Sequence, residues 1–222
     1  MARMIRSGSR TTFGAGNAFA RRLSRRWAAA KLARFIGYLR PVSRGARGRH
    51  LEVIDIGSGR GAVTELLRSR GFRVVPVDVC DSAMHWGVRP MLYDGVRLPF
   101  ETNAFDVALL LTVLHHTADP ERVLLEAARV ADRVVVIEDT FHARLKGILT
   151  MAVDSLANFE FRGHPHTNRT GRQWRRTFRR LGLRLRAART DYLFGFVEQT
   201  TYWLDASSLR VDEKEAYWHD GQ

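Results

Sequence analysis

Short apolar runs alternate with helical patterns through most of the chain after residue 50. The segments "LEVIDIG", "FRVVPVDV", "AFDVALLLTVL" and "DRVVVIEDT" are almost continuously apolar, whereas "AVTELLRSRG" and "DPERVLLEAARVA" repeat apolar residues every three or four positions. Apolar strands separated by amphipathic helices are typical of a parallel sheet that is covered on both faces. The pattern therefore predicts an α/β fold, a Rossmann-like, doubly wound and mostly parallel sheet.

Three further patterns complete the predicted domain, which spans residues 51–222. A short strand is expected within "RPMLYDG", and "TGRQWRRTFRRLGL" is typical of a late helix. The segments "RLRAARTDYLF" and "FVEQTTYWLDA" predict an antiparallel pair of strands at the C-terminus. Between these parts, residues 141–170 follow no regular period, and we interpret them as an insert.

Residues 1–50 are predicted to form a separate basic arm. Asn17 is a candidate helix cap for a helix over 18–39, and Pro41 is expected to end it. One reading is a lid helix that packs on the domain over the substrate pocket. Another is a basic amphipathic helix, residues 17–39, that lies on an anionic membrane. A protein or RNA contact and an organelle transit peptide are further alternatives. The apolar side of this helix comprises Phe19, Leu23, Trp27, Leu32, Phe35, Ile36 and Leu39.

The charge distribution changes the meaning of the net charge of +13. Residues 1–51 hold 13 of the 36 basic residues and no acidic residue, while the rest of the chain has 23 of each sign. The basic character thus belongs to the arm, and the high pI does not by itself indicate nucleic-acid binding. Cys80 is the only cysteine, which excludes an intramolecular disulfide and fits a cytoplasmic protein. We expect it to be a small buried residue.

The segment "VIDIGSGRGA" at Val53–Ala62 predicts a nucleotide site, because a strand, a glycine turn and a helix start follow one another. Gly57, Gly59 and Ala62 satisfy the dinucleotide pattern, so an NAD-binding protein is one interpretation. A phosphate-binding loop of the Gly-Lys-Ser/Thr type is excluded. Asp55 argues against a pyrophosphate, which its carboxylate would repel. It fits a ligand with an ammonium group, or a carboxylate that only fixes the loop.

Four segments, in order and at similar intervals, resemble the motifs of class I S-adenosylmethionine-dependent methyltransferases, in particular the type 11 small-molecule subgroup. They are "VIDIGSGRG", "VVPVDVCDSAM", "YDGVRLPFETNAFDVALLL" and "VLHHTADPERVLLEAARV". The resemblance covers about residues 51–140 and weakens toward 204. It implies that S-adenosylmethionine is the cofactor and that a methyl group moves by in-line displacement to a small or lipid-like acceptor. Inserts such as 141–170 shape the acceptor site in this fold.

The resemblance implies that the glycine turn holds the methionine part of the cofactor. The residues of this turn are Gly57, Ser58, Gly59 and Gly61. Asp55 would support the turn and the ammonium side of the ligand.

The resemblance also assigns the nucleoside side of the cofactor. Asp78, at the end of the second strand, would accept hydrogen bonds from both ribose hydroxyls, and Val79 would pack on the adenine. Asp94 would accept from the adenine amino group, with a backbone contact from Gly95. Thr112, at the end of the fourth strand, would line the methionine pocket.

Candidate catalytic residues follow the strands whose carboxyl ends should meet at the site: His115, His116 and Asp139, with Glu138 and the more distant His142, His164 and His166 as alternatives. A general base is needed only if the acceptor is a hydroxyl or a protonated amine. The histidine pair can equally be a structural signature near the cofactor, and the acids can cap a helix.

Two other kinds of site are not indicated by the sequence, and three alternatives to a small-molecule methyltransferase remain. No metal site is predicted, because "HPH" lacks a third ligand. The aromatic pairs at 202–203 and 217–218 are too few for a nucleic-acid surface and are expected to serve packing. A catalytically silent scaffold that regulates a partner, an RNA methyltransferase and an NAD-binding protein remain the rival interpretations.

Overall fold

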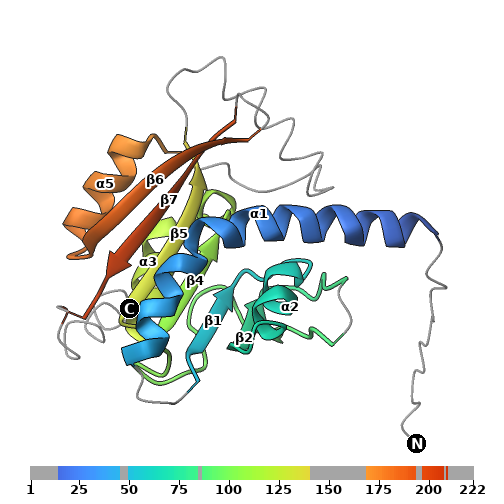
Figure 1. The fold of residues 1–222 in the computed structure, drawn as a ribbon. Helices are drawn as coiled ribbons and strands as arrows, with labels where there is room; N and C mark the ends of the chain where they lie inside the picture. Colours follow the sequence, from blue (N-terminus) through green and yellow to red (C-terminus); the bar gives the residue numbers. More distant parts are fainter. Residues whose placement is uncertain are drawn as a thin grey trace, which may run out of the picture.

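The computed structural model describes residues 15–45, 50–84, 87–140, 169–193, 197–207 and 209 as one seven-stranded sheet between two layers of helices (Figure 1). The strand order is β3-β2-β1-β4-β5-β7-β6. Strands β3, β2, β1, β4 and β5 are parallel, and β7 runs antiparallel to both β5 and β6. The predicted α/β class, the doubly wound sheet and the antiparallel C-terminal pair are confirmed.

The strands lie where the apolar runs predict them. Their bounds are β1 (Glu52–Ile56), β2 (Arg73–Asp78), β3 (Met91–Leu92), β4 (Val107–Leu111), β5 (Arg133–Asp139), β6 (Arg184–Leu193) and β7 (Val197–Asp205). All five residues of β4 are buried because helices cover both faces of the sheet. Odd and even positions of β4 consequently point into two different hydrophobic clusters.

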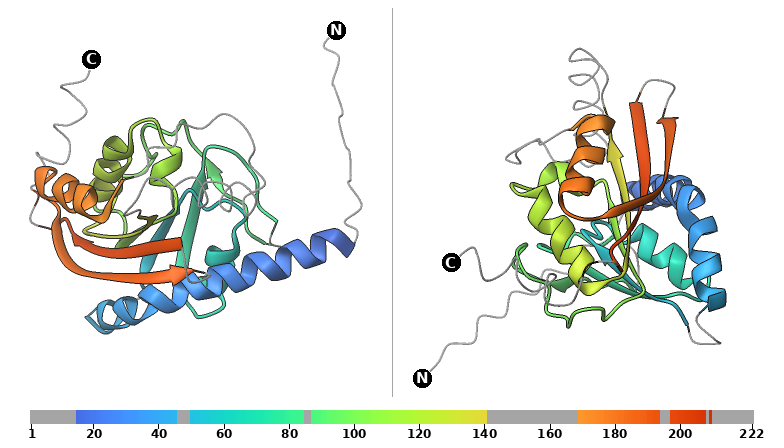
Figure 2. Two further views of the ribbon diagram at one scale, coloured as in Figure 1. Left: turned by 90° about the horizontal axis from the view of Figure 1, so that it is seen from above. Right: turned by 90° about the vertical axis from the view of Figure 1, so that its left-hand side faces the viewer.

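Helices cover the two faces in pairs (Figure 2). On one face, α3 (Pro120–Val130) and α5 (Gly171–Arg180) share a cluster with Ile54, Leu110 and Val136. On the other face, α1 (Ala15–Gly45) and α2 (Ala62–Arg68) share a cluster with Val53, Leu109 and Val135. The short 3-10 helix η1 (Leu114–His116) follows β4 and leads toward α3.

The N-terminal helix is longer than predicted and is built into the domain. It continues past Pro41 to Gly45, because the fixed φ of proline is compatible with a helix and only one backbone hydrogen bond is lost. Leu32, Phe35 and Leu39 are fully buried against the sheet and α2. The half of α1 near its N-terminus extends beyond the sheet (Figures 1 and 2), and Phe19 there is 72% exposed.

A buried ion pair on α3 holds the loop that precedes β4. The Glu126 carboxylate accepts hydrogen bonds from the Leu98 N–H and from the guanidinium of Arg129 at 2.7 and 2.6 Å. Arg129 also donates to the carbonyl oxygens of Leu98 and Phe100. Both charged side chains are almost fully buried. The pair thus fixes the chain that leads from Asp94 back into the sheet.

Two other expectations can be compared with the structure. Cys80 was expected to be buried, but it is exposed, because it lies just beyond the end of β2 where the chain leaves the sheet. Tyr202 and Trp203 are buried in the core, as expected of packing residues. Among the helices described, none is both long and apolar enough to cross a membrane.

Candidate functional site

The carboxyl ends of β1, β2, β4 and β5 meet at one edge of the sheet, and the predicted site residues follow these ends. The loop after β1 needs its glycines. Gly57, Gly59 and Gly61 have φ angles of 70°, 51° and 79°, in the left-handed region that side chains with a Cβ rarely adopt. A Cβ on Gly57 would lie 2.6 Å from Val113, whereas a Cβ on Gly59 would meet nothing within 4 Å. The loop is therefore tightly packed at Gly57 and open at Gly59.

The backbone N–H groups of this loop are largely used within the protein. Those of Gly57 and Ser58 donate to the carbonyl oxygen of Val77, and that of Gly61 donates to the carbonyl oxygen of Ser58. The N–H of Gly59 donates to the Asp78 carboxylate at 2.7 Å. The loop thus differs from an anion-binding nest, in which such groups point at the ligand. The hydroxyl oxygen of Ser58 is buried, and no described residue forms a hydrogen bond with it.

Asp55 lies at the base of this loop and is 2% exposed. One carboxylate oxygen accepts a hydrogen bond from the Thr64 hydroxyl of α2 at 2.6 Å. Burial raises the pKa of Asp55 to about 6, although the Thr64 hydrogen bond and the positive charge of Lys31 act in the opposite direction. The carboxylate thus ties α2 to β1, and its negative charge is costly in the absence of a further cation.

Asp78 is the last residue of β2, Val79 follows it, and both lie beside the glycine loop. The Asp78 carboxylate accepts from the Val79 N–H at 2.7 Å on one oxygen and from Gly59 on the other. Val79 is 59% exposed, which is unusual for a valine that directly follows a buried strand. A Cβ on Gly95 would lie 3.2 Å from the Val79 side chain. Val79 and Gly95 thus lie close together next to the Asp78 carboxylate.

Asp94 is exposed and caps its own loop. Its carboxylate accepts hydrogen bonds from the N–H groups of Val96 and Arg97 at 2.8 and 2.9 Å. The Arg97 N–H, followed by that of Val96, lowers the pKa of the Asp94 carboxyl group. One carboxylate oxygen of Asp94 therefore caps the loop, and the side chain as a whole is exposed.

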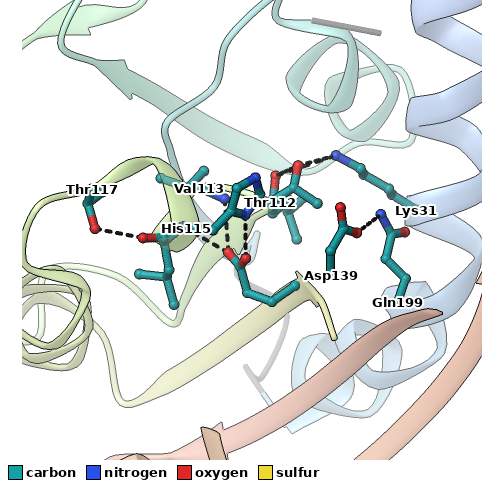
Figure 3. Close-up of polar contacts among 10 residues, drawn as sticks. Lys31, Thr112, Val113, His115, Thr117, Asp139 and Gln199 are labelled. Carbon is teal, nitrogen blue, oxygen red and sulfur yellow. Dashed lines mark hydrogen bonds and ion pairs between the residues drawn. The ribbon is translucent and has the colours of Figure 1, made fainter. Parts of the chain in front are cut away.

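Thr112, at the end of β4, adopts a strained backbone conformation. Its φ is 61°, which costs on the order of 1–3 kcal/mol for a β-branched residue. Its hydroxyl oxygen accepts a hydrogen bond from the Lys31 ammonium at 2.6 Å and donates to the Leu111 carbonyl. Figure 3 shows Lys31 reaching from α1 to this point. The N-terminal helix therefore contributes a cation at the site edge.

Glu138 organises the segment that follows β4. One carboxylate oxygen accepts hydrogen bonds from the N–H groups of Val113 and Leu114 at 3.0 and 2.8 Å. The other lies 2.5 Å from Nδ1 of His115, which is 2% exposed (Figure 3). His116 is half-buried, and its ring lies 4.0 Å from that of His115. His115 thus belongs to a buried support, and His116 is the more accessible of the two.

Asp139 is linked to α1 through a polar relay. Its carboxylate accepts a hydrogen bond from the Gln199 amide nitrogen at 2.7 Å (Figure 3). The amide oxygen of Gln199 in turn accepts from the Arg34 guanidinium at 2.5 Å. Arg34 also lies 3.6 Å from the Asp191 carboxylate of β6. Two residues of α1, Lys31 and Arg34, therefore contact the ends of β4 and of the β5–β7 pair.

Several candidates lie outside the described residues. Most of the predicted insert belongs to this group, and so do His142, His164 and His166. Within the part of the chain that the structure describes, no three histidine, cysteine or acidic residues are grouped as metal ligands.

Comparisons with known proteins agree with this geometry. Residues 54–134 match the family model of a methyltransferase domain. A ubiquinone biosynthesis O-methyltransferase of Hahella chejuensis is 30% identical over 90 residues. That match covers 36% of this chain and 38% of the relative, so the chain spans little more than a third of that protein's length.

Solved structures show the same fold at low sequence identity. A chain of the complex that contains the Haloferax volcanii methyltransferase activator Trm112 has a TM-score of 0.61 at 17% identity, with 85% of this chain and 95% of that chain covered. Magnesium protoporphyrin IX methyltransferase of Synechocystis, solved with bound SAH, has a TM-score of 0.58 at 15% identity, with 89% and 90% covered.

Residues 54–134 thus match a methyltransferase domain, and the described sheet has the fold of solved methyltransferases.

The contributions of Lys31, Arg34 and Gln199 were missed by sequence reasoning. Lys31 carries one weak signal, because it is one of only three lysines in an arginine-rich chain. Its contact with Thr112 joins residues 81 positions apart, and no local pattern indicates such a pair. Glu138 was noted as a candidate, but its support of Val113, Leu114 and His115 became visible only in three dimensions.

Proposed function

We propose that the protein is an S-adenosylmethionine-dependent methyltransferase that acts on a small-molecule acceptor. The observation that carries the proposal is the loop of Gly57–Gly61, open at Gly59, with the Asp78 carboxylate and the exposed Val79 beside it. The exposed side chain of Val79 and the Ser58 hydroxyl, which has no hydrogen-bond partner among the described residues, fit a ligand with an aromatic base and polar groups. The predicted roles of Asp78, Val79, Asp94, Gly95 and Thr112 remain parts of this proposal.

The same loop disfavours the dinucleotide interpretation. A pyrophosphate is held by backbone N–H groups at a glycine turn. Here the N–H groups of Gly57, Ser58, Gly59 and Gly61 have acceptors within the protein. The buried carboxylate of Asp55 adds a negative charge below the turn. Both features support a ligand that brings positive rather than negative charge to this position.

When bound, S-adenosylmethionine supplies a methyl group that its sulfonium already activates. The chain's own residues then have to bind, orient and exclude water, which can provide most of the rate. Asp78 is fixed by the Gly59 and Val79 N–H groups and is pre-oriented for hydroxyl donors. Asp55 offers its charge to an ammonium group. Ionised Asp55 becomes more favourable when such a cation arrives.

A proton acceptor is required if the acceptor group is a hydroxyl. We place His116 in this role because it is half-buried beside the buried pair of His115 and Glu138. His115 then acts as a positioning residue, held by the Glu138 carboxylate. Asp139 is 5% exposed and bonded to Gln199, so it is better suited to hold β7 and α1 in place.

The acceptor is proposed to be small and at least partly apolar. The name of the Hahella relative, an O-methyltransferase of ubiquinone biosynthesis, supports this class. Membrane contact through residues 17–39 has weaker support, since Leu32, Phe35 and Leu39 are already buried in the core. Phe19 and Leu23 are the large apolar residues of this helix that remain more than 40% exposed.

Calorimetric titration of S-adenosylmethionine and, separately, of NAD tests the cofactor. We expect micromolar binding of the former and a loss of at least tenfold in Asp78→Asn, because a charged acceptor of hydrogen bonds contributes about 1.5–3 kcal/mol. Asp81→Asn, an exposed acid three residues later, is the matched control and should bind normally. Preferential NAD binding would contradict the proposal. Cofactor binding without methyl transfer to any phenol, amine or thiol of a broad panel would favour the silent scaffold.

A further inference from the structure

The charges of the site leave one part of the cofactor without an assigned partner. S-adenosylmethionine has a sulfonium, an ammonium and a carboxylate. Asp55 and Asp78 lie next to the glycine loop and suit the ammonium and the ribose hydroxyls. They would repel the carboxylate. That group needs a cation or a set of N–H donors at the methionine end of the site.

The glycine loop is poorly suited to bind this carboxylate. The N–H groups of Gly57 and Ser58 donate to Val77, and that of Gly61 donates to Ser58. The N–H of Gly59 is directed to Asp78. Binding a carboxylate with these groups would break hydrogen bonds that define the loop. A cation presented beside the loop by another element would bind the carboxylate without breaking these four hydrogen bonds.

Lys31 of α1 is the cation that the fold brings to this place. Its ammonium lies 2.6 Å from the Thr112 hydroxyl oxygen and 3.4 Å from the Leu111 carbonyl oxygen, at the end of β4. The neighbouring Val113 side chain packs directly against Gly57. Burial raises the pKa of Asp55, and the Lys31 charge acts against this shift, so its charge reaches the base of the glycine loop. The side chain is half-buried, where a charge pair is screened less than at the surface.

The backbone at Thr112 supports a functional role for this contact. A threonine at a φ of 61° is strained, and such strain persists where the surrounding structure imposes it. Helix α1 is anchored in the core by Ala28 and Leu32, which lie on either side of Lys31 in the helix sequence, and by Phe35. The ammonium is thus presented from a rigid element rather than from a loop.

We infer that Lys31 binds the methionine carboxylate of the cofactor, so that the N-terminal helix completes the cofactor site. This inference rests on the proposed function. It explains why a helix outside the segment that matches the methyltransferase family model reaches the end of β4 with a lysine.

The test compares S-adenosylmethionine with decarboxylated S-adenosylmethionine, which lacks only the carboxylate. Both are titrated into the wild type, Lys31→Met and Arg26→Met at pH 7.5, above the pKa of Asp55. Arg26→Met removes an equal charge from an exposed position of the same helix. We expect Lys31→Met to weaken S-adenosylmethionine binding by about tenfold to a hundredfold. Binding of the decarboxylated ligand should stay within about twofold or become tighter, because a like charge is removed.

Equal weakening of both ligands in Lys31→Met, or no change for either, would overturn the inference while leaving the proposed function intact. Failure of the wild type to bind either ligand would instead refute the proposed function. Thermal unfolding monitors the fold of each variant. If Lys31→Met does not fold, Lys31→Gln keeps a polar side chain next to Thr112, and the same ratio of affinities decides the question.

Discussion

Because the Asp55 carboxylate is buried, we expect it to lower the free energy of unfolding at neutral pH. Burial raises its pKa from 3.8 to about 6 in the folded chain. Since the folded state then holds its proton more tightly than the unfolded state, this group stabilises the fold below about pH 4 and loses that effect as pH rises through 6. At pH 7.5 the difference between the two pKa values corresponds to about 3 kcal/mol of lost stability.

Asp55→Asn isolates this contribution. Asparagine has nearly the same shape, and its amide oxygen can still accept from the Thr64 hydroxyl. We expect the variant to be more stable than the wild type by up to about 3 kcal/mol at pH 7.5, and by about half of that at pH 5. Urea unfolding at both pH values measures the difference, in which the titration of all other groups cancels. The same variant should bind S-adenosylmethionine at least tenfold more weakly, because the ammonium loses its counter-charge.

A stability advantage that does not change between pH 5 and pH 7.5 would refute this reasoning. It would mean that Asp55 titrates normally in the folded state or that the substitution acts through packing. If the variant is more stable but its affinity for S-adenosylmethionine is unchanged, the expectation that Asp55 attracts the ammonium group is refuted. The charge would then be costly without serving the ligand.

Two further predictions test the architecture around the site. Gly61→Ala places a Cβ 2.6 Å from Val88 at a φ of 79° and should destabilise the fold by about 2–4 kcal/mol. Gly71→Ala has a similar φ of 84° but open space around the new Cβ, so it should cost only about 1 kcal/mol. Equal losses of stability in urea unfolding would argue against the steric cause. Arg129→Met leaves the buried Glu126 carboxylate without its counter-charge and should cost about 3–5 kcal/mol in the same assay, and a loss below about 1 kcal/mol would show that the pair contributes little.

The parts of the fold that depend on local pattern could be predicted from the sequence. Apolar runs located the strands of the sheet, because strands buried on both faces leave a continuous signal. The alternating glycines of "GSGRG" predicted the loop, because only glycine readily adopts the three positive φ angles found there. The antiparallel pairing of the two C-terminal strands was predicted from the same kind of pattern.

The remaining features depend on contacts between distant parts of the chain. Pro41 was wrongly expected to end α1, since packing of the helix against the sheet outweighs the loss of one hydrogen bond. The apolar stripe of this helix could not distinguish a membrane surface from a protein core, because both bury the same side chains. The relay from Arg34 through Gln199 to Asp139 joins three elements, and the sequence gives no sign of it.

The docking of α1 also sets an order of events during synthesis. The helix is the first described element of the chain, yet Arg34 bonds to a residue 165 positions later, and Lys31 to one 81 positions later. A nascent chain therefore carries Arg34 without its Gln199 partner until β7 has been made. Contacts of such long range form late and slowly. The contacts that link α1 to the ends of both β4 and β7 are thus completed only after Gln199 has been synthesised.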